Sequence, residues 1–133
     1  MKITTLSAQQ TEALGIRLSK KIKKGNIVGV YGELGAGKTT LIRGIIKAIE
    51  GVNLVPSPTF NIIIEYEQII HMDLYRLGEE DFYSLGLDNL EEKIVLVEWP
   101  ERFHYFLIPD IKIRIYVENE VKRVIEIDGI PWN

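Results

Sequence analysis

Residues 27–40 read Ile27-Val28-Gly29-Val30-Tyr31-Gly32-Glu33-Leu34-Gly35-Ala36-Gly37-Lys38-Thr39-Thr40. The segment before the first loop glycine is apolar without alternation, which is typical of a strand buried on both faces. The segment from Gly32 to Thr39 matches the phosphate-binding pattern G-x-x-x-x-G-K-[ST] at every fixed position. Apolar residues at helical spacing follow until Gly51. The order of strand, glycine-rich loop and helix predicts a phosphate-binding loop.

Each residue type in this loop has a physical role. Glycines let successive backbone N–H groups turn inward toward phosphate oxygens, and the following helix directs its positive N-terminus at the same anion. Lys38 adds a full charge at the β- and γ-phosphates, and the Thr39 hydroxyl is a hard oxygen ligand for Mg²⁺. We therefore expect the nucleotide to contact Gly32, Glu33, Leu34, Gly35, Ala36, Gly37, Lys38, Thr39 and Thr40.

Hydrolysis also needs an acidic residue near the metal and a group that orients water. Two predicted strands end in an acid, Ile69–Asp73 and Ile94–Glu98. The second is the more uniformly apolar, so we expect it to lie next to the loop strand and Glu98 to hold magnesium together with Thr39. Asp73 then orients or activates water, or reaches magnesium through water, and an ordinary surface ion pair is the alternative. The predicted catalytic residues are Lys38, Asp73 and Glu98.

Three further side chains have less specific patterns. Thr59 lies on a loop stiffened by Pro56 and Pro58, and it could sense the γ-phosphate as switch loops do. An ordinary turn is the alternative. Trp99 is interpreted as a core anchor rather than a nucleotide stacker. His71 is interpreted as a partly buried strand histidine rather than a base.

The rest of the chain supports an α/β class with one mixed sheet. Ser7 and Gln10 form a capping box at the start of a predicted helix. We predict a single P-loop NTPase-like domain over residues 1–133, with a mixed β-sheet flanked by helices. Besides the elements above, we expect a helix over 7–24, strands over 61–66 and 69–75, one short helix in 77–92, a helical turn in 101–107, and antiparallel strands over 111–117 and 121–127.

Composition limits the class of protein. The chain has 133 residues, of which 46% are hydrophobic and 26% are charged, and this balance is typical of one soluble globular domain. The absence of cysteine excludes a disulfide scaffold, a thiolate zinc site and a cysteine nucleophile. The start of the chain has no apolar stretch of signal-peptide length, and no uncharged run is long enough for a membrane helix. We therefore expect a cytoplasmic protein.

Charge is distributed unevenly along the chain. Residues 1–25 hold six Lys/Arg against one Glu, whereas residues 65–101 hold eleven Asp/Glu against two Lys/Arg. Such a split favours a protein partner of mixed charge, and a solvated acidic face is the alternative. The net charge of −3 argues against autonomous nucleic-acid binding, which usually involves a basic domain.

Four segments occur in an order that resembles one family. They are Leu34–Thr40, Ser57–Phe60, His71–Arg76 and Glu98–Pro100. Together they resemble the TsaE family, also called YjeE, which comprises small bacterial P-loop ATPases required for threonylcarbamoyl modification of tRNA. The resemblance extends over nearly the whole chain. A local departure is Glu33, where aspartate is usual in the family.

The resemblance implies ATP or ADP with Mg²⁺ as ligands, magnesium held by Thr39 and Glu98, and hydrolysis that needs Asp73. It also implies that Arg123 lies near the nucleotide and that Ser7–Thr11 approaches the adenine. The expected function is that of an accessory factor with slow ATP turnover, which binds a complex of TsaD and TsaB and meets tRNA only through it. Two alternatives are a small kinase acting on a metabolite or nucleoside, and a nucleotide-dependent binding module that does not hydrolyse.

Overall fold

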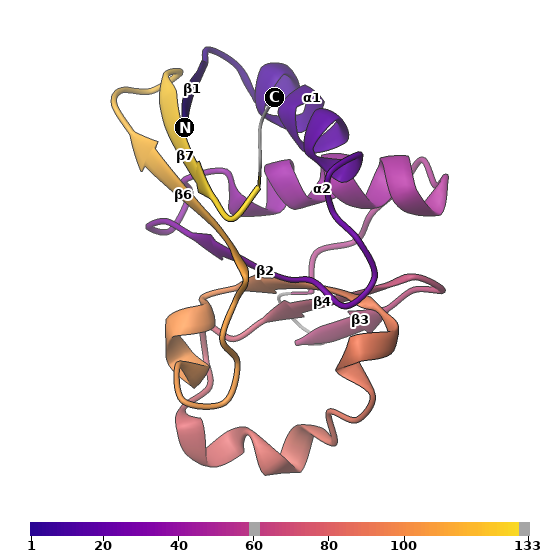
Figure 1. Cartoon of the computed structure of the whole chain (residues 1–133). Coiled ribbons are helices and arrows are strands. Elements are labelled where there is room, and N and C mark those ends of the chain that lie inside the picture. The colour runs from indigo at the N-terminus through magenta and orange to yellow at the C-terminus, as the bar shows by residue number, and fades with distance from the viewer. Residues whose placement is uncertain (59–61, 131–133) are drawn as a thin grey trace.

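Seven strands form one mixed sheet in a computed structural model that describes residues 1–58 and 62–130 (Figure 1). The strand order across the sheet is β1-β7-β6-β2-β5-β4-β3. This arrangement confirms the α/β class and the mixed sheet. The strands are β1 (Lys2–Thr5), β2 (Ile27–Tyr31), β3 (Ile63–Glu65), β4 (Ile69–Asp73), β5 (Ile94–Glu98), β6 (Ile111–Val117) and β7 (Arg123–Asp128).

The centre of the sheet is parallel. Strand β2 pairs in parallel with β5 on one side and with β6 on the other, and β4 pairs in parallel with β5. The outer pairs β1–β7, β6–β7 and β3–β4 are antiparallel. The carboxyl ends of β2, β4 and β5 therefore meet at one edge, where ligands bind in open α/β sheets. The prediction that Ile94–Glu98 lies next to the loop strand is confirmed.

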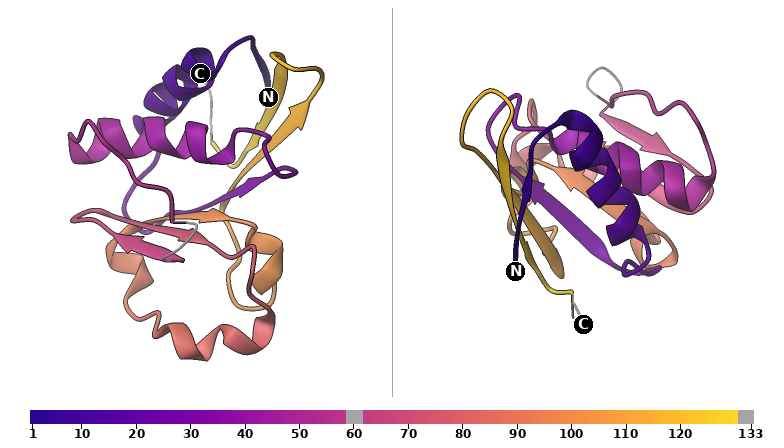
Figure 2. Two further views of the ribbon diagram at one scale, coloured as in Figure 1. Left: turned by 180° about the vertical axis from the view of Figure 1, so that it is seen from behind. Right: turned by 90° about the horizontal axis from the view of Figure 1, so that it is seen from above.

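Two kinds of element cover the two faces of the sheet (Figures 1 and 2). The helices α1 (Ala8–Ser19) and α2 (Lys38–Glu50) lie side by side on one face. Short 3₁₀ turns lie on the opposite side of the sheet, at the bottom of Figure 1. Aromatic rings in and beside these turns pack against one another. The turns are η1 (Glu79–Asp81), η2 (Tyr83–Leu85), η3 (Leu90–Glu92) and η4 (Pro100–Phe103).

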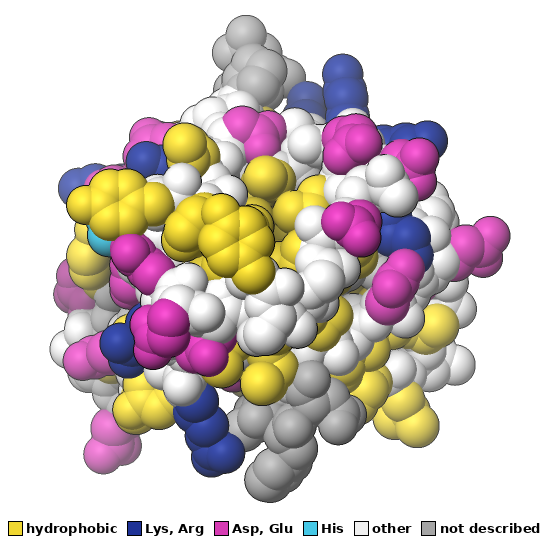
Figure 3. Space-filling model, turned by 90° about the horizontal axis from the view of Figure 1, so that it is seen from below, with side chains coloured by type: hydrophobic (Ala, Val, Ile, Leu, Met, Phe, Trp, Pro, Cys, Tyr) yellow, Lys and Arg dark blue, Asp and Glu magenta, His cyan; other side chains and the backbone are white. Residues whose placement is uncertain are grey.

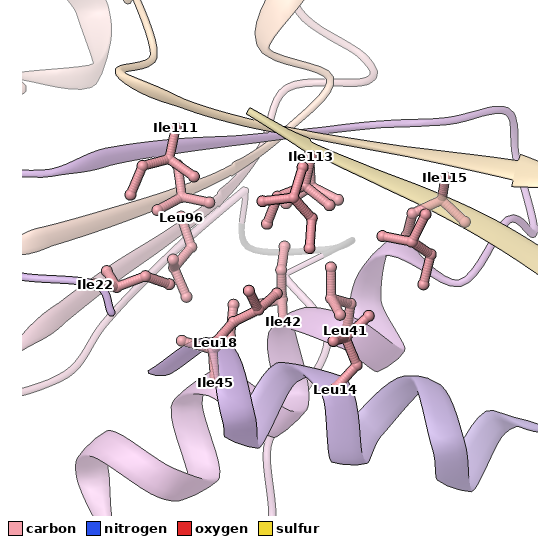
Figure 4. Packing of buried hydrophobic residues seen from close by; sticks show 14 of the residues in the cluster. Leu14, Leu18, Ile22, Leu41, Ile42, Ile45, Leu96, Ile111, Ile113 and Ile115 are labelled. Atoms are coloured by element: carbon pink, nitrogen blue, oxygen red, sulfur yellow. The ribbon is translucent and has the colours of Figure 1, made fainter. Parts of the chain in front are cut away.

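The larger core lies between the two helices and the sheet (Figure 4). Leu14 and Leu18 of α1 and Ile42 and Ile45 of α2 point at strand residues such as Ile113, and all five are buried. Burying a side chain of this size contributes about 1.5–3 kcal/mol relative to leaving it exposed. This packing fixes α2 against the sheet and so sets where the loop before it lies.

Two glycines let the helices approach closely. A Cβ atom built on Gly15 would lie 2.1 Å from the Leu41 carbonyl oxygen, and one on Gly44 would lie 2.1 Å from the Glu12 carbonyl oxygen. Both obstacles are backbone atoms, which cannot rotate away. These positions therefore accept no side chain while the helices keep this spacing.

Several boundaries differ from those expected. Helix α1 ends at Ser19 rather than at residue 24, because the chain turns there and the Asn26 side chain accepts a hydrogen bond from the Lys23 N–H. The expected single helix in 77–92 is wrong: three 3₁₀ turns occur instead. Gly86 (φ 61°) and Asn89 (φ 57°) have left-handed backbones that interrupt a continuous helix.

Strand boundaries also shift. Strand β7 begins at Arg123 rather than at residue 121, because the N–H groups of Val121 and Lys122 donate to the side-chain oxygen of Asn119. Strand β4 ends at Asp73 rather than 75, and β3 is described only from Ile63. Strand β1 was not expected, since its four residues carry little pattern, and it is held by antiparallel pairing with β7. Among residues 1–58 and 62–130, no helix is long and apolar enough to cross a bilayer.

Candidate functional site

The phosphate-binding loop connects β2 to α2 at the carboxyl edge of the sheet. Gly35 has φ 78° and Gly37 has φ 105°, a left-handed backbone that side chains disfavour. Gly37 is the N-cap of α2, and its carbonyl accepts the first helical hydrogen bond, from the Leu41 N–H. The free N–H groups of the first turn of α2 therefore open onto the concave side of this loop.

Lys38 is held inside the loop. Its ammonium donates to the carbonyl oxygens of Gly32 at 2.6 Å and Glu33 at 2.9 Å, and the residue is only 5% exposed. The same nitrogen lies 4.5 Å from the centroid of the Trp99 ring. Burial lowers the pKa of Lys38, while the carboxylates of Glu98 and Asp73 act in the opposite direction. The site thus places one cation between a loop of carbonyls and two acids.

Glu98 joins the loop helix to the sheet. Its Oε1 accepts a hydrogen bond of 2.9 Å from the Thr39 hydroxyl, and its Oε2 lies 2.8 Å from Nε2 of His71. Glu98 is 3% exposed and ends β5, the strand next to the loop strand. The hydroxyl and the carboxylate that meet at the mouth of the loop are hard oxygen donors, the ligand type that magnesium prefers, so this pair could hold Mg²⁺.

Asp73 lies beside Glu98 in the parallel register of β4 and β5. Its Oδ1 accepts a hydrogen bond of 3.0 Å from the Tyr75 N–H, and it makes no ion pair within the described residues. Burial raises the pKa of Asp73; the Tyr75 N–H lowers it and the nearby Glu98 carboxylate raises it further. The surface ion pair considered as an alternative is therefore not the arrangement found, and Asp73 faces the cleft.

A cleft of about 440 Å³ brings these groups together. It contains most of the residues expected from sequence and some that were not. Gly32 and Glu33 lie behind it, where their carbonyls hold Lys38. Thr59 falls outside the described residues, and its role stays a prediction. The cleft is lined by Leu34, Gly35, Ala36, Gly37, Lys38, Thr39, Thr40, Ile62, Asp73, Tyr75, Arg76, Glu98 and Trp99.

A second hollow of about 370 Å³ adjoins the other side of the loop. It is lined by the start of α1, by loop residues and by Arg123. Arg123 Nε donates to the Ala36 carbonyl at 3.0 Å, and its Nη1 donates to the Asn119 carbonyl at 2.9 Å. The structure thus brings Arg123 and the Ser7–Thr11 segment to the phosphate-binding loop.

Sequence reasoning missed how two residues act in this site. His71 was expected in a strand and partly buried; it is completely buried and contacts Glu98. The signal for this contact is the two-residue period of a strand, which places His71 on the same face as Asp73. Trp99 does pack against the lower core, as expected, but it also lines the cleft, with a left-handed backbone at φ 60°.

Comparisons with known proteins identify relatives of this chain. The family model described as "Threonylcarbamoyl adenosine biosynthesis protein TsaE" matches residues 5–125. A protein of Nostoc sp. with the name "tRNA threonylcarbamoyladenosine biosynthesis protein TsaE" is 35% identical, and the match covers 99% of this chain and 86% of the relative. A protein of the same name from Rickettsia felis is 39% identical over 90% of this chain and 74% of its own length.

A solved structure described as "Crystal structure of Bacillus subtilus YdiB" is similar with a TM-score of 0.72 and 28% identity. That match covers 94% of this chain and 82% of the other. The family model extends over most of the chain, including the phosphate-binding loop, Asp73, Glu98 and Arg123. The chain therefore belongs to the TsaE family.

Proposed function

We propose that this protein binds ATP with Mg²⁺ in the cleft, hydrolyses it slowly, and acts as an accessory factor in tRNA threonylcarbamoyladenosine biosynthesis. The observation that carries the proposal is the contact between Thr39 and Glu98 beside Lys38, at the end of a glycine-rich loop. Family membership supplies the biological setting.

The loop is suited to a triphosphate. Phosphate oxygens would replace the two carbonyls that now accept from Lys38, and a charged partner of this kind makes the stronger hydrogen bonds. A Cβ built on Gly35 would meet nothing within 4 Å, so the left-handed backbone, rather than crowding, is what requires glycine there. The nucleotide would therefore bind along Gly35–Thr39, with its adenine in the hollow near Ser7–Thr11 and Arg123.

The acids divide the remaining work. Thr39 and Glu98 would hold magnesium, which neutralises charge that develops on the phosphates. Asp73 has a carboxylate in the same cleft with no cationic partner among the described residues, and its raised pKa makes it a better proton acceptor than an ordinary aspartate. We assign Asp73 to orienting or activating the attacking water.

Calorimetry and phosphate release test the ATPase assignment. Lys38→Ala should abolish ATP binding, and Glu98→Ala should reduce the gain in affinity that Mg²⁺ provides and the release of phosphate. Lys47→Ala is the matched control. Lys47 lies on the same helix but outside the cleft lining, and its ammonium lies 2.7 Å from the Glu12 carboxylate. Wild-type ATP affinity in Lys38→Ala would refute the site.

The same assay separates the alternatives. Labelled phosphate found on an organic acceptor from a metabolite panel would support the kinase, whereas ATP binding without phosphate release, alone or with partners, would support the binding module. Free phosphate supports the ATPase.

The partner proposal is a complex of TsaD- and TsaB-type proteins in the cytoplasm, with tRNA met only through that complex. An exposed aromatic patch, consisting of Tyr83 (79% exposed) and Phe106 (38%) with ring centroids 5.6 Å apart, supports binding of a protein. Figure 3 shows hydrophobic side chains gathered on this lower face with acidic ones around them. The acidic residues of η1 and Glu101 lie close in sequence to the patch. The complementary surface on a partner would therefore be apolar and bordered by Lys and Arg.

Calorimetry tests this proposal by measuring the binding of purified TsaD- and TsaB-type proteins from the same organism. The double variant Tyr83→Ser/Phe106→Ser should weaken binding at least tenfold, which corresponds to about 1.4 kcal/mol. Tyr116→Ser is the control, because Tyr116 is 49% exposed on β6. No binding by the wild-type protein would refute the partner, and equal binding by the double variant would refute the patch.

A further inference from the structure

His71 is a buried polar residue that the proposed reaction leaves without a role. Its side chain is completely inaccessible, at the centre of β4 and beside Leu96 of β5. It points to the same face of the sheet as Asp73, two residues later. An apolar residue would fill this position at lower cost, because a buried imidazole must be hydrogen-bonded.

Within residues 1–58 and 62–130, the side chain of His71 has Glu98 as its hydrogen-bond partner. Its Nε2 lies 2.8 Å from Oε2 of that carboxylate, whereas Nδ1 has no hydrogen-bond partner among the described residues. A carboxylate oxygen accepts hydrogen bonds, so the 2.8 Å contact with Oε2 is a hydrogen bond when the ring carries a proton on Nε2. A ring protonated on Nδ1 alone would bury an N–H without an acceptor among the described residues and direct a lone pair at Oε2. The surroundings therefore select a single tautomer.

This hydrogen bond restricts Glu98. Three rotatable bonds separate its carboxylate from the backbone, and Lys38 and Asp73 lie near enough to influence it electrostatically. Because His71 engages Oε2, the other oxygen, Oε1, is directed at the Thr39 hydroxyl at 2.9 Å. Carboxylates that bind a metal ion are commonly oriented by hydrogen bonds from neighbouring residues that do not bind the metal themselves.

We infer that His71 is a positioning residue, which donates Nε2–H to Glu98 and so directs the second carboxylate oxygen at the magnesium position beside Thr39. The inference rests on the proposed function, because it assigns Glu98 to magnesium. His71 itself is not among the described residues that line the cleft. Its contribution is to hold Glu98 in the binding orientation before the ligands arrive, so that less ordering is needed when they bind.

Three variants test the inference by calorimetry of ADP binding in EDTA and at saturating Mg²⁺. His71→Met removes the donor at similar volume, and His71→Gln keeps an N–H near the position of Nε2. His104→Gln is the matched control, because His104 is the other histidine of the chain and its side chain is 58% exposed. His71→Met should leave affinity in EDTA unchanged and reduce the Mg²⁺-dependent gain about tenfold, and His71→Gln should restore most of it.

The outcomes are separable. No Mg²⁺-dependent gain in the wild-type protein would refute the proposed function. A normal gain in the wild-type protein and an equal gain in His71→Met would refute the positioning role. Equal losses in His71→Met and His71→Gln would mean that the shape of the ring, rather than its N–H, matters, and would also refute it.

A second measurement needs no substitution of His71. Nitrogen-15 NMR of the imidazole rings in the wild-type protein reports which ring nitrogen carries the proton, and His104→Gln assigns the remaining signal to His71. The inference expects the proton on Nε2. A proton on Nδ1 with none on Nε2 would overturn it, even where His71→Met fails to fold.

Discussion

The ammonium of Lys38 lies 4.5 Å from the centroid of the Trp99 ring, within the range of a cation–π contact. Trp99 in turn lies against Tyr75, with ring centroids 4.9 Å apart, and the Arg102 guanidinium lies 5.8 Å from the Trp99 centroid. The left-handed backbone of Trp99 directs its ring into the cleft rather than along the strand. The indole is thus in contact with the group that phosphate would engage.

Trp99 fluorescence should therefore report nucleotide binding. A Trp132→Phe background leaves Trp99 as the only tryptophan of two, and ADP with Mg²⁺ should change its emission as Lys38 exchanges its carbonyl partners for phosphate. Lys38→Met should abolish the change, whereas Lys47→Met, on the same helix, should preserve it. Saturation by calorimetry without any change in emission would contradict the coupling.

Asp73→Asn should increase the stability of the protein and decrease its ATP turnover. The pKa of Asp73 is raised in the folded protein, chiefly by burial, so the unfolded chain ionises more readily than the folded one. Above the ordinary aspartate value of 3.8 this difference opposes folding, and stability falls as pH rises through the folded pKa. Asp73→Asn should therefore raise the free energy of unfolding at neutral pH, and the advantage should disappear as pH is lowered toward 3.8.

Urea denaturation across this pH range measures the effect, and phosphate release measures turnover. If Asp73 activates water, turnover by Asp73→Asn should fall by at least about a hundredfold while ADP affinity changes little. Asp88→Asn, an exposed acid outside the cleft, is the control. A variant that is less stable at neutral pH, or one that keeps full turnover, would contradict this account.

The centre of the sheet and the loop were predictable because their residues carry strong local signals. The uniformly apolar run Ile94–Glu98 correctly indicated a strand buried beside β2, which places Glu98 opposite the loop. The contact between Thr39 and Glu98 followed from that placement. The acidic segment 77–92 carried no such period, and its left-handed Asn89 was not evident from residue type alone.

Contacts between distant segments were the least predictable. The pairing of β1 with β7 depends on register between strands far apart in the chain, and so does the choice of Glu98 as the partner of His71; the strand period indicates only which face His71 lies on. The Gly15–Gly44 crossing is similar, since a glycine within a helix signals only lower helix propensity.

Gly44→Ala should destabilise the protein although alanine is the better helix former. The new Cβ would lie 2.1 Å from the Glu12 carbonyl oxygen, so the helices must separate and loosen the core beneath them. Overpacking of this kind costs about 1–3 kcal/mol beyond the gain of up to about 1 kcal/mol in propensity. Urea denaturation should show the loss. Ala48→Gly, on the exposed side of α2, is the control that measures only the difference in helix propensity between alanine and glycine. A Gly44→Ala variant that is more stable than the wild-type protein would contradict the close approach of the helices.

Arg123 should matter for nucleotide binding through the shape of the loop. Its Nε–H donates to the Ala36 carbonyl at 3.0 Å and its Nη1 to the Asn119 carbonyl at 2.9 Å, so one side chain ties the β6–β7 turn to the phosphate-binding loop. Arg123→Met removes these hydrogen bonds and leaves the loop free to sample other shapes. ADP affinity by calorimetry should weaken roughly tenfold, as expected for loss of a hydrogen bond from a charged group. Lys122→Met is the control, because the Lys122 ammonium forms a salt bridge with the exposed Glu118 at 3.8 Å and does not line either hollow among the described residues. Unchanged affinity in Arg123→Met would mean that the loop keeps its shape without this tie.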